Sequence, residues 1–269
     1  MINVYFADIG PLSDEALFAS LYNRISPARQ EKVSSFRFPK GKRLSLAAAI
    51  LLDQGLKPYG LHEQDMKYGF GEKGKPFLIG HPEIAFSISH SEEKVMVAVS
   101  GACQSTACQL GADGPRVTTC QLGADIEKIE TADLALAKRF FASAEHEILC
   151  QLQPGAEQDQ AFYRLWTLKE SFIKATGRGL ALPLKSFQVD LGNDYRGPAL
   201  SQTYDDNTYQ LIEIDAYPGY KSAICINQAA AALNAAGIKA ELGGSHQTPA
   251  AAALNAAGIK IHYIDLRSI

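Results

Sequence analysis

The amino-acid sequence predicts an α+β fold. Helical segments and short strand-like segments follow one another in mixed order, without the regular strand–helix repeat of a doubly wound parallel sheet. The strand candidates are short, apolar and rich in β-branched residues, as at residues 95–99. With 269 residues, the chain can form one large domain or two modest ones around an ample core.

In the first half of the chain, helices precede a small sheet. Ser13 begins a helical pattern whose first turn is favoured by Asp14 and Glu15, and Ser26-Pro27 begins a second helix with proline at its first position. An apolar, alanine-rich segment at 44–56 predicts a buried helix. The strands expected around these helices, which we expect to form an antiparallel sheet, lie at 2–7, 77–79, 84–89 and 95–99.

The second half repeats this order only loosely. A helix carries residues 166–174 and is expected to end near Gly177 and Gly179. The other elements expected in this half are a strand at 122–127, helices at 134–141 and from Ser143, and strands at 187–191, 209–214 and 222–226.

Two segments occur twice. Cys-Gln-Leu-Gly-Ala-Asp stands at 108–113 and 120–125, and an alanine-rich stretch of eleven residues stands at 229–239 and 250–260. Two copies are too few for a solenoid, so we interpret them as local duplications that lengthen a loop and a C-terminal tail. The tail has helix-forming composition but is interrupted by Gly237 and Gly258.

These observations divide the chain into four regions. We expect an N-terminal half at 1–102, an enlarged loop at 103–120, a C-terminal half at 121–228 and the duplicated tail at 229–269.

Composition bounds the class of protein. The formal net charge of −3 argues against a bulk nucleic-acid binder. Between Arg24 and Arg43, however, basic residues outnumber the single acid Glu31, which fits either a solvated helix face or a surface for a polyanionic ligand.

The five cysteines form no Cys-x-x-Cys pair, as expected for reduced thiols in the cytoplasm. The sequence shows neither a basic segment typical of a signal peptide nor an apolar run of the ~20 residues that span a bilayer. We therefore expect a cytoplasmic protein without a membrane anchor.

Two carboxylates stand at strand spacing. Asp125 and Glu127 leave the same face of the strand predicted at 122–127 because side chains alternate along a strand. Like charges so placed repel unless a cation or water separates them. Alone, the pair also fits an exposed strand face with solvated acids.

A third carboxylate lies on the helix at 166–174. Glu170 and Lys174 are four residues apart and share a helix face, a spacing that alone fits an ordinary surface ion pair. Trp166, one turn earlier, fits a core position. Joined to Asp125 and Glu127, Glu170 completes an oxygen-ligand set suited to Mg²⁺, and Lys169 and Lys174 would face phosphate oxygens.

Two further segments suit an anion. Ser89 and His90 stand near the end of a predicted strand, where hydroxyl and imidazole groups can hold phosphate. A turn containing Gly74-Lys75-Pro76 suits anion contact or simply solubility. The chain lacks both a Gly-x-Ser-x-Gly elbow and a Gly-x-x-x-x-Gly-Lys-Ser/Thr loop, which disfavours a serine hydrolase and a P-loop ATPase.

In this order, the four segments resemble those of the 4′-phosphopantetheinyl transferases, specifically the larger, surfactin-synthetase-activating type. The family motifs Gly-x-Asp-x-Glu and Trp-x-x-Lys-Glu-Ser/Ala-x-x-Lys correspond to 123–127 and 166–174, preceded by Ser89-His90-Ser91 and Gly74-Lys75-Pro76. The resemblance extends from about residue 2 to residue 226.

This resemblance implies two similar α+β halves related by a pseudo-twofold axis, with the active site between them. It implies Mg²⁺-dependent transfer of the 4′-phosphopantetheine arm from coenzyme A to a serine of an apo acyl or peptidyl carrier protein, releasing 3′,5′-ADP. A monomer would suffice for this reaction.

The resemblance also implies residue roles. Asp125, Glu127 and Glu170 correspond to metal ligands, and Glu170 and Lys174 to catalytic residues. The positions matching coenzyme A contacts are Arg43, Lys75, Ser89, His90, Lys169 and Lys174.

One departure concerns the duplicated loop. It contains a second Leu-Gly-Ala-Asp, but Asp113 is followed by Gly-Pro instead of a residue and a glutamate, so we reject Asp113 as a ligand.

Two other interpretations remain. The chain could bind coenzyme A without transferring the arm, or it could be a structural α+β protein whose acids and lysines form surface ion pairs.

Overall fold

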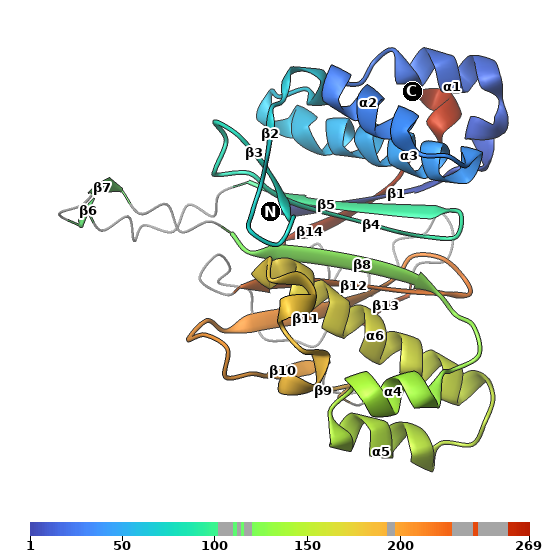
Figure 1. The fold of residues 1–269 in the computed structure, drawn as a ribbon, viewed down its shortest axis with the longest axis vertical. Coiled ribbons are helices and arrows are strands. Elements are labelled where there is room, and N and C mark those ends of the chain that lie inside the picture. The colour runs from blue at the N-terminus through green and yellow to red at the C-terminus, as the bar shows by residue number, and fades with distance from the viewer. Residues whose placement is uncertain (102–109, 112–113, 116–119, 193–196, 228–238, 242–257) are drawn as a thin grey trace.

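The structure, a computed structural model, describes residues 1–101, 110–111, 114–115, 120–192, 197–227, 239–241 and 258–269. These residues form two four-stranded sheets stacked face to face, each covered by helices on its outer side (Figure 1). The expected α+β class is confirmed. The duplicated segments, including Asp113, lie largely outside the described residues.

The N-terminal sheet has the order β14-β1-β5-β4. Strands β1 (Ile2–Asp8), β5 (Lys94–Ser100) and β4 (Ala85–Ser91) pair antiparallel, and β14 (Ile259–Tyr263) pairs parallel to β1. Three helices cover its outer face: α1 (Glu15–Tyr22), α2 (Pro27–Ser35) and α3 (Pro39–Leu56). A small hairpin of β2 (Tyr68–Phe70) and β3 (Pro76–Leu78) lies beside them.

Helix capping explains where the first two helices begin. The Asp14 carboxylate accepts from the amides of Ala16 and Leu17, so α1 begins at Glu15 and not at Ser13, which ends a short 3₁₀ turn. Ser26 caps α2 and Pro27 is its first residue, which confirms the second helix start.

The C-terminal sheet has the order β13-β11-β12-β8. Strands β11 (Tyr209–Asp215), β12 (Tyr220–Asn227) and β8 (Leu122–Lys128) pair antiparallel, and β13 (Lys239–Glu241) pairs parallel to β11. Its helices are α4 (Leu134–Phe140), α5 (Ser143–Gln151) and α6 (Ala156–Thr176). The remaining strands form two short hairpins, β6 (Leu110–Gly111) with β7 (Gly114–Pro115), and β9 (Gln188–Asp190) with β10 (Ala199–Ser201).

The two sheets share one core because side chains alternate along each strand. Val4 and Phe6 of β1 point toward Ala124 and Ile126 of β8, whereas Tyr5 points toward the helices. At the edge between the sheets, Ser87 of β4 accepts the amide of Ala124 at 2.9 Å. Strands β4 and β8 therefore lie side by side, and the functional segments meet along this seam.

The end of the chain belongs to the N-terminal half. Ile259 is buried between the sheets, Leu266 is buried under the helices, and the Arg24 guanidinium donates to the backbone oxygen of Ile269 at 2.5 Å. Residues 258–269 thus complete the first sheet, a role that the sequence alone does not assign to the tail. Among the described residues, none of the helices combines the length and the apolar character that a membrane span requires.

Candidate functional site

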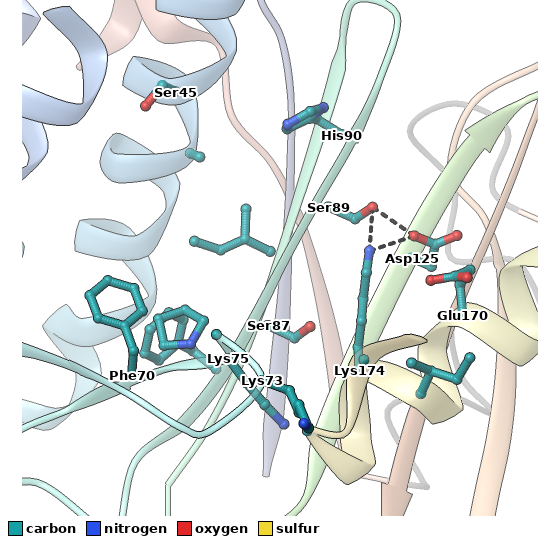
Figure 2. Close-up of a pocket in the computed structure, with 18 of the residues that line it drawn as sticks. Ser45, Phe70, Lys73, Lys75, Ser87, Ser89, His90, Asp125, Glu170 and Lys174 are labelled. Carbon is teal, nitrogen blue, oxygen red and sulfur yellow. Dashed lines mark hydrogen bonds and ion pairs between the residues drawn. The ribbon is translucent and has the colours of Figure 1, made fainter. Parts of the chain in front are cut away.

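A cavity of about 890 Å³ opens between the two halves (Figure 2). Its walls are α2 and α3, the β2–β3 hairpin, β4, β8 and the C-terminal part of α6. The residues proposed from the sequence that line it are Lys75, Ser89, His90, Asp125, Glu127, Glu170 and Lys174. The structure therefore gathers segments that are up to 100 residues apart in the chain.

Gly123 brings β8 and α6 into close contact. A Cβ atom at this position would lie 1.9 Å from the carbonyl oxygen of Ser171 and 2.4 Å from the amide of Ala175, so only glycine fits without backbone movement. This approach places Asp125 on β8 beside Glu170 and Lys174 on α6 (Figure 2). The glycine of the Gly-x-Asp-x-Glu segment is thus a packing requirement of the site.

Asp125 is the centre of the polar contacts. Its Oδ1 accepts from the Lys174 ammonium at 2.6 Å and from the Ser89 hydroxyl at 2.8 Å, while Lys174 also donates to the Ser89 hydroxyl at 2.9 Å. Oδ2 is buried and has no hydrogen-bond partner among the described residues. Burial raises the pKa of Asp125, against the opposing effect of Lys174.

Burial and the negative charge of Asp125 raise the pKa values of the other two carboxylates, those of Glu127 and Glu170. Burial, followed by repulsion from Asp125, raises the pKa of Glu127 to about 7. The same two causes raise the pKa of Glu170, while Lys174 acts in the opposite direction. One buried acid and two half-buried acids, whose pKa values the buried one helps to raise, are the electrostatic setting that a cation relieves.

As the side chains stand, no group of three His, Cys, Asp or Glu in the described part of the chain is gathered as a metal-ligand cluster. The donor chemistry nevertheless fits a hard divalent cation, because the unpartnered Asp125 Oδ2 and two mutually repelling glutamates line the same cavity.

His90 and Lys75 stand on the side of the cavity formed by the N-terminal half. Partial desolvation and the nearby Lys174 lower the pKa of His90. The Lys75 ammonium donates to the carbonyl oxygens of Leu122 at 2.9 Å and Ala175 at 3.1 Å. Burial lowers the pKa of Lys75 to about 8.

The structure adds polar residues that the four sequence motifs do not contain. Arg29 and Lys32 of α2 and Ser45 of α3 line the cavity, and the Ser45 hydroxyl is buried without a hydrogen-bond partner in the described residues. The only sequence signal for Arg29 and Lys32 was the excess of basic residues between Arg24 and Arg43, and Ser45 lies outside that segment. Arg43 itself does not line the cavity.

The coenzyme role expected for Lys169 is not supported by its position. Its side chain is fully buried, and its ammonium donates to Glu145 at 2.7 Å and to the carbonyl oxygen of Phe187 at 2.8 Å. Lys169 therefore belongs to the core of the C-terminal half and does not line the cavity. Trp166, for which a core position was expected, lines the cavity and stacks on Phe162.

Comparison with known proteins defines the class to which this site belongs. Residues 121–225 match the 4′-phosphopantetheinyl transferase superfamily. The chain is 32% identical to a 4′-phosphopantetheinyl transferase of Bacillus subtilis over 74% of this chain and 86% of that protein. It is 34% identical to the 4′-phosphopantetheinyl transferase Sfp of Bacillus subtilis strain 168, over 75% of this chain and 81% of that protein.

A further relative is the 4′-phosphopantetheinyl transferase HetI of a Nostoc species, 30% identical over 70% of this chain and 73% of that protein. The chain belongs to the 4′-phosphopantetheinyl transferase family, in the group related to Sfp, and is an enzyme of that type. The resemblance inferred from the four motifs is confirmed.

Proposed function

We propose that this enzyme transfers the 4′-phosphopantetheine arm of coenzyme A to a serine of an apo acyl or peptidyl carrier protein, in a Mg²⁺-dependent reaction that releases 3′,5′-ADP. The observation that carries the proposal is the unpartnered, buried Oδ2 of Asp125 in a cavity shared with Glu127, Glu170 and Lys174. This arrangement is costly for a merely structural role, because it concentrates acids and leaves a buried oxygen of one of them without a hydrogen-bond partner among the described residues.

Asp125, Glu127 and Glu170 would hold the Mg²⁺ ion. A bound ion at this place would neutralise charge on the pyrophosphate of coenzyme A and orient it. Lys174 is already held beside Asp125 and Ser89, so its ammonium is positioned to act on the same phosphate oxygens.

The remaining cations and donors suit the rest of the polyanionic coenzyme. Arg29, Lys32 and His90 line one wall of the cavity, and the Ser45 hydroxyl offers an unused hydrogen bond. Because Ser45 lines the cavity and Arg43 does not, we propose that Ser45, rather than Arg43, makes the contact from α3.

Glu170 is the proposed general base. The serine oxygen of the carrier would form a bond to the phosphorus that bears the pantetheine arm, and the bond from that phosphorus to the 3′,5′-ADP oxygen would break. The serine proton would pass to the Glu170 carboxylate, which lines the same cavity as Asp125 and Lys174.

We also propose that the two halves are related by a pseudo-twofold axis, as the family resemblance implies. Support comes from element order: β1, α1–α3, the β2–β3 hairpin and β4–β5 correspond in sequence to β8, α4–α6, the β9–β10 hairpin and β11–β12. Both three-stranded cores, β1-β5-β4 and β8-β12-β11, are antiparallel in the matching order. Strands β4 and β8 would then line a site between the two units.

The test is a transfer assay. Incubation of the protein with an apo-carrier, coenzyme A and Mg²⁺ should raise the mass of the carrier by that of the arm, and chelation of the metal should stop the reaction. Thermal stabilisation by coenzyme A without any mass gain on acyl or peptidyl carriers would support the binding protein instead.

A further inference from the structure

Lys75 connects the two halves through a single side chain. It stands in the turn between β2 and β3, on the N-terminal side of the cavity, yet both of its hydrogen bonds reach the C-terminal half. Its stem also lies close to that half: a Cβ atom added to Gly177 would lie 3.3 Å from the Lys75 Cδ. Gly177 has a φ of +69°, so a side chain there is disfavoured on backbone grounds too.

The two carbonyl acceptors belong to the elements that carry the acids. Leu122 is the first residue of β8, which bears Asp125 and Glu127, and Ala175 lies in the last turn of α6, which bears Glu170. The last carbonyls of a helix lack partners within the helix and form its negative end, so a buried ammonium is a suitable cap. One cation therefore joins the start of β8 to the end of α6.

This bonding leaves little of Lys75 for the coenzyme. Two of its three N–H donors are committed to main-chain oxygens. Besides burial, the influences on its pKa come from two buried thiols, Cys120 and Cys225. Burial lowers its pKa only to about 8, so the ammonium stays mostly charged at neutral pH.

We propose that Lys75 is a positioning residue that holds β8 against α6, and thereby fixes Asp125 and Glu127 relative to Glu170, instead of binding a phosphate group of the coenzyme. The inference rests on the proposed function, because its consequence is a change in metal use during transfer. It predicts that loss of the Lys75 ammonium changes the relative positions of the three carboxylates, although neither of the Lys75 hydrogen bonds reaches any of them.

The experiment compares Lys75→Met, which keeps the stem and removes the charge, with Lys75→Arg, which can still donate to two carbonyls. Lys67→Met is the matched control, since Lys67 precedes the same hairpin and is exposed. Each variant is assayed for kcat, for the Mg²⁺ concentration giving half-maximal rate, and for the ratio of rates with coenzyme A and 3′-dephospho-coenzyme A.

Lys75→Met should raise the half-maximal Mg²⁺ concentration by about tenfold, the lower range seen when groups that orient metal ligands are removed. The ratio between the two coenzymes should stay at the wild-type value. Lys75→Arg should recover most of the metal response, and Lys67→Met should match the wild type throughout.

Three results would overturn the proposal. A fall in the coenzyme ratio would make Lys75 a ligand of the 3′-phosphate, and a higher KM for both coenzymes with unchanged Mg²⁺ response would make it a ligand of the pyrophosphate. A lower Tm with wild-type kinetics below the melting range would make it a stabilising contact only. Absence of transfer by the wild-type protein would instead count against the proposed function.

Discussion

Helix α6 carries two lysines, five residues apart, that form the same kind of ion pair on different sides of the helix. Lys169 contacts Glu145 at 2.7 Å and Lys174 contacts Asp125 at 2.6 Å. The first pair is completely buried, whereas the Lys174 side chain is 31% exposed in the cavity.

The two carboxylates differ in how fully they are satisfied. Glu145 accepts from Lys169, from the amide of Val189 and from the amide of Ala142, so both of its oxygens have partners. Asp125 has partners on one oxygen only, among the residues that the structure describes. A buried ion pair whose carboxylate oxygens all have partners has a structural role. A buried pair that leaves one carboxylate oxygen without a partner indicates a place where a ligand is expected.

The two ion pairs should differ most in their effect on turnover, because only the Asp125–Lys174 pair lies in the cavity. Asp125→Ala should lower kcat by roughly 10³-fold, because a metal ligand supplies several kcal/mol of charge stabilisation in the transition state. The carrier-modification assay measures this loss at saturating Mg²⁺. Without Mg²⁺, the Tm of Asp125→Ala should be no lower than that of the wild type, because the substitution removes one of three carboxylates that repel one another. A variant with wild-type turnover would refute the metal role of Asp125.

The second effect falls on stability. Lys169→Met should lower the free energy of unfolding by roughly 3–5 kcal/mol, because it leaves the Glu145 carboxylate buried without its cation. Denaturant unfolding measures the change, and the double variant Lys169→Met/Glu145→Gln should recover part of it.

In the temperature range where Lys169→Met is folded, kcat and the KM for coenzyme A should stay near wild-type values. A raised KM with unchanged unfolding would return Lys169 to the coenzyme site and remove the contrast between the two lysines.

The contrast within α6 also shows what the sequence could predict. Glu170 and Lys174 are four residues apart and share a helix face, so their common placement followed from helical geometry. Lys169 precedes Glu170 and is five residues from Lys174, about 500° of helical rotation and thus a different face. The motif suggested a phosphate contact for Lys169, but the helix period favours the core position that the structure shows.

Other features depend on contacts between distant segments and could not be read from local patterns. Asp125 and Glu127 were correctly placed on one strand face by the period of a strand. The position of Ser45 in the cavity wall depends on how α3 packs on β5 and β1, and the pairing of β14 with β1 joins residues more than 250 positions apart. No periodicity of the tail indicates which strand it will join.

The weakest of these effects concerns pH. It tests whether the acids around Asp125 form a cation-binding site. Glu127 has its pKa raised from 4.5 to about 7, so protons compete with Mg²⁺ below pH 7. The Mg²⁺ concentration that gives half-maximal rate should therefore rise by up to about tenfold for each pH unit below 7.

The same pKa shift of Glu127 affects the stability of the metal-free protein. The folded state holds this proton between pH 4.5 and about 7, while the unfolded state releases it. The contribution of Glu127 to stability is therefore full below pH 4.5 and is lost as pH rises to about 7. Thermal melting across this range should show that slope, Glu127→Gln should flatten it, and added Mg²⁺ should offset it; a wild-type slope unchanged by Glu127→Gln would assign the titration to another group.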